Sequence, residues 1–366
     1  MGINDVIIII VVCFLCLGAI DKCFGNRLGF GQHFTDGFMT MGSLMLAMVG
    51  IISLAPVLAR ILTPIIAPIY GFIGADPAVF ANTILAIDMG GYALAQEMAQ
   101  NKEAGLFAWV FLGTMMGPTI VFTIPVALGI IRKEDHTYFA KGILLGLITI
   151  PIGCLVGGIL AGFSIQLIII NLIPTLLFSA LISMGLWKKP GQMIIGFSIF
   201  GKCVEIIAII GLTAIIIKTL TGFIVIPYLT PLEEGIQIVG QIAIFLAGAF
   251  PMVHFISKVF KKPLYKLGSK LSISDTSTAG LVASLAHSIP MLALLKHMDA
   301  RGKVINVAFA VSGAFVLGGH LGFVAGINKE IVFPMIVGKL IAGFSAIILA
   351  MIVLKKSNGT GRHSYK

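Results

Sequence analysis

Charged residues are scarce in this chain. Its 25 Lys plus Arg and 15 Asp plus Glu make up 11% of 366 residues, whereas an ordinary soluble protein carries roughly 25%. Hydrophobic residues make up 58%. This composition excludes a secreted disulfide scaffold, a cytosolic enzyme and a nucleic-acid-binding protein, and it indicates a membrane protein. The formal net charge of +10 is explained by Lys and Arg in cytoplasmic loops.

Motifs of catalysis and of metal binding are also missing. The sequence contains no His-Glu-x-x-His, no Gly-x-Ser-x-Gly and no phosphate-binding loop, and its seven histidines are scattered. We therefore expect no enzyme and no cofactor. The cysteines lie in or beside apolar runs, where we interpret them as small hydrophobic residues rather than as a redox motif: Cys13, Cys16, Cys23, Cys154 and Cys203.

Long apolar runs take up most of the chain, and short polar turns join them. Each run is long enough to cross about 30 Å of hydrocarbon as a helix. We predict an all-α polytopic membrane protein with about 9 to 11 transmembrane helices. The runs cover residues 3–20, 38–59, 63–98, 104–131, 139–162, 165–186, 191–217, 235–257, 273–295, 304–327 and 331–354. The first lacks a basic leader and a cleavage pattern, so we expect it to be retained.

Two of these runs, 63–98 and 273–295, carry polar and helix-breaking residues in their middles. The first contains Ala86-Ile-Asp-Met-Gly-Gly-Tyr92 and the second Ala286-His-Ser-Ile-Pro290. Non-helical backbone at membrane depth is tolerated only inside protein or beside a water-filled cavity. We therefore predict two discontinuous or re-entrant segments that lie near each other. With both re-entrant, Lys and Arg collect on one side, which places the N-terminus outside and the C-terminus in the cytoplasm.

The spacing of the runs repeats within the chain. A shift of 199 residues places Asp76 on Asp275 and Asp88 on His287. Because an odd number of crossings separates equivalent elements in the re-entrant topology, we predict two inverted repeats, each with one broken or re-entrant helix. The predicted units are a first membrane repeat (1–164), a connector helix (165–190), a second membrane repeat (191–354) and a cytoplasmic tail (355–366).

Asp88 is the strongest candidate for a binding residue. It lies at the first break, before two glycines and Tyr92, and a carboxylate beside an aromatic ring suits a small cation. The alternative interpretation is that Asp88 caps the second half-helix.

Other polar residues inside the runs have two interpretations each. Lys202 and Glu205 lie three residues apart on one helical face and predict an ion pair inside the membrane, or a structural pair near a membrane end. His287, beside Ser288, is either a proton-sensitive gate or a packing histidine. The break at 117–119 frees carbonyls that line a path or merely kinks a helix.

Two stretches resemble a known family. Residues 82–98 read Asn-Thr-Ile-Leu-Ala-Ile-Asp-Met-Gly-Gly-Tyr-Ala-Leu-Ala-Gln-Glu-Met, and residues 113–129 read Gly-Thr-Met-Met-Gly-Pro-Thr-Ile-Val-Phe-Thr-Ile-Pro-Val-Ala-Leu-Gly. Both resemble the bacterial ethanolamine-utilisation transporter family, EutH, and the resemblance continues through 312–323. It implies passage of ethanolamine across the bacterial cytoplasmic membrane. The ethanolamine would feed a cobalamin-dependent ammonia lyase that is often housed in a microcompartment.

Protonated ethanolamine carries an ammonium at one end and a hydroxyl at the other. We expect Asp88 and Tyr92 to receive the ammonium. The candidates for the hydroxyl are Asn82, Thr83, Thr119, His287 and Ser288. Facilitated diffusion is the favoured mechanism, because buried acids are scarce. The alternatives are an ion-coupled carrier for another small polar solute and a channel for ammonium-like cations.

The expected partners are the ethanolamine substrate and the lipid bilayer, with no nucleic acid. Gly146 and the glycines of 153–162 suit close helix contacts within or between protomers. A homodimer is a hypothesis on that basis.

Overall fold

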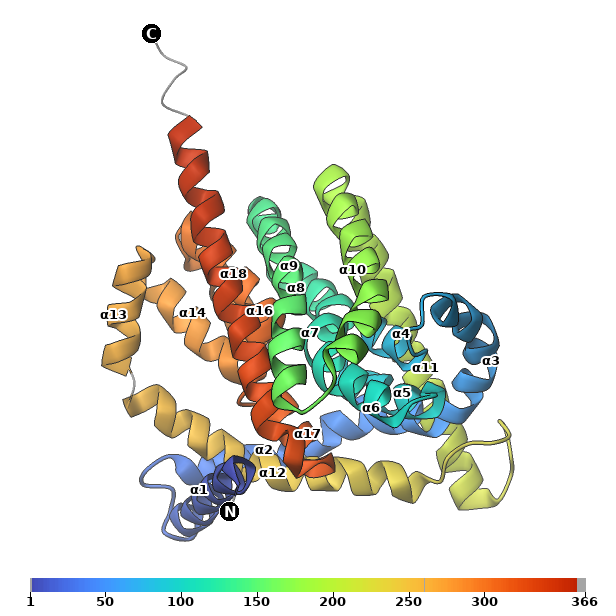
Figure 1. Cartoon of the computed structure of the whole chain (residues 1–366). Coiled ribbons are helices and arrows are strands. Elements are labelled where there is room, and N and C mark those ends of the chain that lie inside the picture. The colour runs from blue at the N-terminus through green and yellow to red at the C-terminus, as the bar shows by residue number, and fades with distance from the viewer. Residues whose placement is uncertain (1, 260, 361–366) are drawn as a thin grey trace.

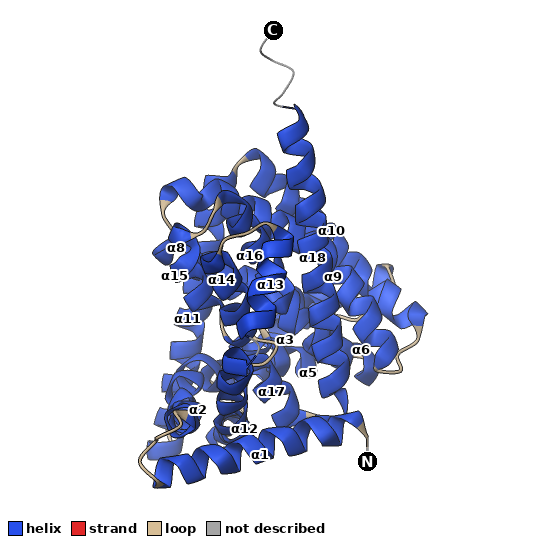
Figure 2. Ribbon diagram, turned by 90° about the vertical axis from the view of Figure 1, so that its left-hand side faces the viewer, coloured by secondary structure: helices blue, strands red, loops and turns tan. Residues whose placement is uncertain are grey.

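The computed structural model describes residues 2–259 and 261–360, and throughout this part helices are joined by turns without any strand (Figure 2). Eight of the described helices are long and apolar enough to cross a membrane. The prediction of an all-α polytopic membrane protein is therefore confirmed.

The elements before residue 161 include a helix of 43 residues, Phe30–Phe72. The sequence predicted a boundary near Arg60, and this was wrong: α3 continues through this position, where the Arg60 guanidinium lies 3.7 Å from the ring of Tyr228. The α-helices of this part are α1 (Ile3–Cys23), α2 (Phe30–Leu44), α3 (Gly50–Phe72), α4 (Ala78–Ile84), α5 (Tyr92–Met98), α6 (Lys102–Phe107), α7 (Gly113–Pro118), α8 (Ile124–Ile130) and α9 (His136–Leu160). Single π-helical turns, 45–49 and 119–123, join α2 to α3 and α7 to α8.

The remaining helices start with α10, which occupies most of the stretch predicted as a connector. They are α10 (Ile165–Lys188), α11 (Pro190–Thr221), α12 (Leu232–Val259), α13 (Lys261–Leu271), α14 (Asp275–Ala286), α15 (Ser288–Leu294), α16 (Ala300–Gly313), α17 (Gly319–Ile327) and α18 (Val332–Thr360).

The first interrupted run folds as a hairpin, residues 76–101, whose two ends meet. The backbone N–H groups of Gln100 and Asn101 donate to Asp76 Oδ2 at 3.0 and 2.8 Å. The Asp76 side chain is buried, so this carboxylate ties the start of α4 to the end of α5. The first hairpin therefore enters and leaves on one side, as the re-entrant interpretation requires.

The second interrupted run also closes through a carboxylate, which here lies at the end of the hairpin rather than at its start. In this second hairpin, residues 274–299, Asp299 Oδ1 accepts from the Ser274 N–H at 2.9 Å and from the Ser277 hydroxyl at 2.7 Å. Partial burial alone would raise the pKa of the Asp299 carboxyl. The hydrogen bonds from Ser277, Ser274 and Gly302 outweigh it and hold this pKa at about 2.

The bases of the two hairpins lie at opposite ends of α9. At the first base, the Asp76 N–H donates to Asn171 Oδ1 at 2.8 Å, and Asn171 belongs to α10, which follows the C-terminal end of α9. Near the second base, Lys303 pairs at 2.5 Å with Asp135, which directly precedes α9. The two hairpins therefore open in opposite directions. The inverted relation of the complete halves remains a prediction.

Helices from the two halves pack directly on each other, α9 on α18 and α2 on α12 (Figure 1). The α9 and α18 backbones approach closely, because a Cβ built on Gly153 would lie 2.4 Å from the carbonyl oxygen of Gly338. A Cβ on Gly146 would meet Val311 of α16. These glycines therefore serve contacts within one chain. Figure 1 shows α2 and α12 running across one end of the upright α9, α10 and α18.

Asp299→Asn should destabilise the second hairpin, because the amide replaces a carboxylate that accepts charge-assisted hydrogen bonds. The expected loss is about 1–2 kcal/mol, discounted for the partial exposure of the side chain. The folded pKa lies below the ordinary 3.8, so this stabilisation is present above pH 4 and is lost as the pH falls towards 2. Thermal unfolding of the detergent-solubilised protein from pH 6 to 3 measures it.

The matched control for this variant is Asp275→Asn. Asp275 lies in the same segment and is exposed, so its replacement should leave the unfolding temperature unchanged. Equal stability of the Asp299→Asn variant and the unaltered protein at pH 6 would show that the carboxylate does not close the hairpin.

Candidate functional site

The tips of the two hairpins line one cavity of about 640 Å³. Asp88 and Met89 come from the first tip, and Ala286 and His287 from the second. The prediction that the two breaks lie near each other is therefore confirmed. Helices α2 and α12 form the opposite side, here called the α2–α12 wall, through His33, Asp36, Thr40, Ser43, Val253, His254 and Ser257.

The first tip is shaped by its glycines. After α4 the chain is extended at Leu85 and Ala86 and then makes one π-helical turn, 87–91. Within that turn Gly90 has φ +88°, a left-handed conformation that side chains disfavour. A Cβ on Gly90 would also lie 2.1 Å from Cγ2 of Ile51 in α3. The glycine after Met89 therefore allows the tip to turn beneath α3.

Asp88 lines the cavity, and its carboxylate has no salt-bridge partner among the described residues. It does not cap the second half-helix: the N–H groups of Met89 and Gly91 donate to the carbonyl of Ala86 instead. The cap interpretation of Asp88 thus has no support in the geometry. A partly exposed carboxylate without a salt-bridge partner has hydrogen-bonding capacity available for a ligand.

At the second tip, His287 has extended backbone and caps α15. Its Nδ1 accepts from the Ile289 N–H at 3.1 Å, so in the neutral ring the proton lies on Nε2. We assign this tautomer from the hydrogen bond. The ring contacts Phe315 and Phe122 with centroids 4.7 and 5.9 Å apart. His287 therefore offers one N–H donor beside two aromatic rings.

The second tip is held by the break between α16 and α17. The N–H groups of Phe315 and Leu317 donate to the carbonyls of Ser284 and Leu285 at 3.0 and 2.9 Å. Phe315 has φ +62°, which is rare for an aromatic residue and marks local strain. These backbone bonds fix Phe315 against His287.

Lys339 of α18 is the most unusual buried group near the cavity, and its side chain is fully buried. Its Nζ donates to the carbonyl oxygen of Thr114 in α7 at 2.5 Å. Pro118 has no N–H, so the carbonyl four residues earlier has no donor within the helix. The freed carbonyl of the 117–119 break is therefore bound by Lys339.

The other predicted site residues lie outside the cavity lining. The ring of Tyr92 packs against Trp109 and Phe323, with centroids 5.2 and 5.5 Å away. Asn82 and Ser288 are buried, and their side-chain polar atoms have no partner among the described residues.

Both predicted threonines make local hydrogen bonds. The Thr83 hydroxyl lies 2.7 Å from the carbonyl of Val79 and 3.0 Å from Thr175 of α10. The Thr119 hydroxyl donates to the carbonyl of Met115 at 2.8 Å. Of the seven predicted site residues, the structure thus brings Asp88 and His287 to the cavity and uses the threonines in packing around the first tip.

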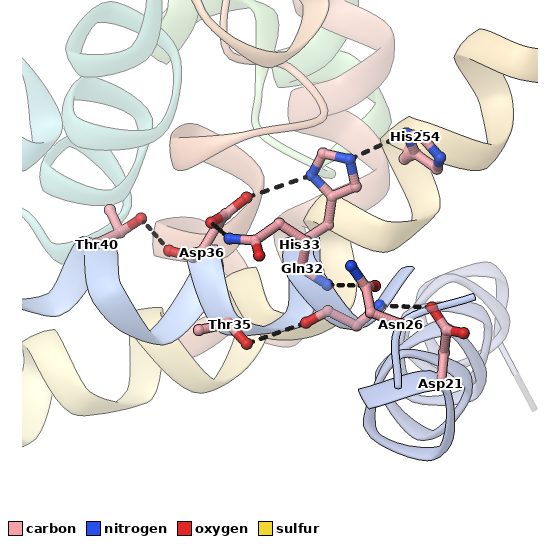
Figure 3. Close-up of polar contacts among 9 residues, drawn as sticks. Asp21, Asn26, Gln32, His33, Thr35, Asp36, Thr40 and His254 are labelled. Carbon is pink, nitrogen blue, oxygen red and sulfur yellow. Dashed lines mark hydrogen bonds and ion pairs between the residues drawn. The ribbon is translucent and has the colours of Figure 1, made fainter. Parts of the chain in front are cut away.

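A polar cluster on the α2–α12 wall was not predicted (Figure 3). His33 Nε2 lies 3.0 Å from His254 Nδ1, and His33 Nδ1 lies 3.5 Å from Asp36 Oδ2. His33 and Asp36 are three residues apart in α2. This spacing is the only feature of the local sequence that could have indicated the cluster. The contact with His254 joins residues 221 positions apart.

The cavity attracts cations. Two carboxylates, Asp88 and Asp36, face it, and none of the described residues that line it is Lys or Arg. Phe122, Phe250 and Phe315 add aromatic surface, which also attracts an ammonium group. The arrangement can hold a small organic cation that also carries a hydrogen-bonding group.

A helical multi-pass membrane protein with such a cavity between two re-entrant hairpins has the architecture of a membrane transport protein. Comparison with known proteins places it more narrowly. The family model described as "Ethanolamine utilisation protein, EutH" matches residues 3–353, and the chain belongs to this family.

Three relatives cover nearly the whole chain. "Uncharacterized protein YxeR" of Bacillus subtilis is 64% identical over 94% of both chains. "Probable ethanolamine permease EutH" of Listeria monocytogenes is 61% identical over 97% of this chain and 95% of its own length. The protein of the same description from Escherichia coli is 44% identical over 98% of both. No solved structure is significantly similar.

Gly90→Ala should distort the first tip, because a left-handed backbone at a residue with a side chain costs roughly 1–2 kcal/mol and the new methyl group would collide with Ile51. We expect a lower unfolding temperature in detergent. Gly42→Ala on α2 is the control, since a Cβ there meets no atom within 4 Å. If both variants were as stable as the unaltered protein, the tip conformation described here would be wrong.

Proposed function

We propose that this chain carries protonated ethanolamine across the bacterial cytoplasmic membrane by facilitated diffusion. The observation that carries the proposal is the unpaired carboxylate of Asp88 in a cavity formed by both hairpin tips. The printed names of the Listeria and Escherichia relatives support the substrate.

The chemistry of the cavity suits both ends of ethanolamine. The ammonium donates to Asp88 in a charge-assisted hydrogen bond and lies against the aromatic rings. The hydroxyl accepts from the Nε2–H of His287, whose other nitrogen is occupied by the Ile289 N–H. In this proposal Tyr92, Asn82, Thr83, Thr119 and Ser288 support the tips and do not touch the substrate.

Opposed hairpins give a route for alternating access. Since the base of each hairpin lies at a different end of α9, movement of one tip exposes the cavity to one side and movement of the other exposes it to the opposite side. The concentration of Lys and Arg on one side of the predicted topology supports a cytoplasmic C-terminus.

Lys339 favours facilitated diffusion over ion coupling. An empty carrier with an unpaired carboxylate at mid-membrane would have to move a net charge through a low-dielectric region. In this proposal the Lys339 ammonium, which is fully buried and donates to the Thr114 carbonyl, balances this charge in the empty state. No coupling cation is then required for the empty carrier to return.

The alternative candidates are an ion-coupled carrier for another small polar solute and a channel for ammonium-like cations. Uptake of labelled ethanolamine into proteoliposomes, first without a gradient and then with proton or sodium gradients of either sign, separates them. Saturable uptake that equilibrates without a gradient supports the proposal. Accumulation only with a gradient indicates coupling, and equal competition by ammonium and ethanolamine indicates a channel.

Asp88→Asn should lower the ratio of maximal uptake rate to KM by roughly 100-fold, because the lost charge-assisted hydrogen bond is worth about 1.5–3 kcal/mol. The matched control is Asp36→Asn, whose side chain faces the same cavity but is 43% exposed. That variant should reduce uptake only slightly. Near-normal transport by a properly inserted Asp88→Asn protein would refute the assignment of the ammonium site.

Lys339→Gln should separate net uptake from exchange. The amide still donates to the Thr114 carbonyl, but the balancing charge is gone, so the return of the empty carrier slows. We expect net uptake to fall at least about tenfold, whereas exchange of labelled for unlabelled ethanolamine across preloaded vesicles persists. Exposed Lys329→Gln serves as the control. A parallel fall of both fluxes would indicate a purely structural lysine, and two unchanged fluxes would exclude charge balancing.

A further inference from the structure

Helix α11 carries an exposed ion pair far from both of its ends. Lys202 Nζ lies 2.8 Å from Glu205 Oε2, and the two side chains are 67% and 54% exposed. Lys202 lies roughly 18 Å from the start of the helix at Pro190, and Glu205 roughly 24 Å from its end at Thr221, at 1.5 Å per residue.

The pair is therefore near the middle of the membrane. Helix α11 is apolar enough to cross it over 191–221, and neither charged group can reach an interface from its centre. Charged side chains at this depth normally face protein or a water-filled cavity. In a single chain this pair faces outward, and its depth favours cover by another protein surface.

The residues around the pair form a continuous stripe. Among the exposed side chains of α11, a row with alternating spacings of three and four residues runs past the pair, and this spacing allows packing against another helix. The stripe consists of Ile195, Ile199, Lys202, Ile206, Ile209, Thr213 and Ile216. The opposite face is already occupied, since Val204, Ala208 and Ile215 are buried within the chain.

We propose that this stripe is the interface of a homodimer, in which two α11 helices pack about a two-fold axis. The charges of Lys202 and Glu205 favour a second copy of this chain as the partner. A two-fold axis brings a surface against its own copy, and a patch with one ammonium beside one carboxylate is complementary to itself. Each Lys202 then lies between its own Glu205 and that of the other copy, and the four charges are shielded from lipid.

Cysteine cross-linking in native membranes tests the interface without any transport assay. The variant has Ile199→Cys, and its exposed native cysteines are replaced by Ala: Cys13, Cys16, Cys23 and Cys203. Oxidation should yield a covalent dimer. The matched control places the cysteine at Leu177 of α10, which is 61% exposed compared with 60% for Ile199, and should yield none.

Charge reversal tests the role of the pair. Lys202→Glu places like charges across the axis and should reduce the cross-linked fraction at least fivefold. The double variant Lys202→Glu/Glu205→Lys restores self-complementarity and should recover cross-linking. The proposal is overturned by absence of cross-linking at position 199, by equal cross-linking at 177, or by a dimer that Lys202→Glu leaves intact.

Discussion

Polar groups inside the bilayer need partners from the protein, and this constraint accounts for most of the structure. Hydrocarbon offers no hydrogen bonds, so each freed carbonyl or buried charge must be satisfied internally. The helix that contains Pro118 would leave the Thr114 carbonyl without a donor, and Lys339 supplies one. The ends of the re-entrant hairpins would expose backbone N–H groups, and Asp76 and Asp299 accept from them. Helix position and hairpin closure thus follow from one requirement.

The sequence predicted those features whose cause is local. The breaks at 86–92 and 286–290 follow from glycine, proline and polar residues within one run, and the Lys202–Glu205 pair follows from a spacing of three on one helix. Contacts between distant segments were not predictable. The Lys339–Thr114 bond joins residues that are 225 positions apart, and the His33–His254 contact joins residues that are 221 positions apart. The hydrophobic periodicity of the sequence does not indicate which helices become neighbours.

The candidate site residues also divide into those whose placement follows from the local sequence and those whose placement does not. Asp88 and His287 lie at the breaks themselves. Irregular backbone at membrane depth requires a polar environment, so the sequence could predict that these two residues lie beside a cavity. Tyr92 and Thr83 lie close to the break in the sequence, but they belong to the half-helices that flank it. Their side chains point along the half-helices into packing. A window of sequence locates the tip, whereas the direction of each side chain depends on backbone angles such as that of Gly90.

The two hairpins resemble each other in closure and differ at their tips, and this difference suits a substrate with two unlike ends. The predicted repeat, a shift of 199 residues, aligns Asp88 of the first tip with His287 of the second. Identical tips would offer the same charge twice and would suit a symmetric ion. An anion from one tip and a neutral N–H donor from the other would instead fix the orientation of the ethanolamine proposed above, which has an ammonium and a hydroxyl.

Among the carboxylates of these hairpins, Asp76 and Asp299 accept backbone hydrogen bonds, whereas Asp88 has no salt-bridge partner among the described residues. A carboxylate that is already bonded has little free energy left to bind a ligand. A carboxylate held without a partner keeps most of it, because the stabilisation is realised only when a cation arrives. That contrast, more than the charge of Asp88 itself, supports the proposal that a cationic substrate binds at this position.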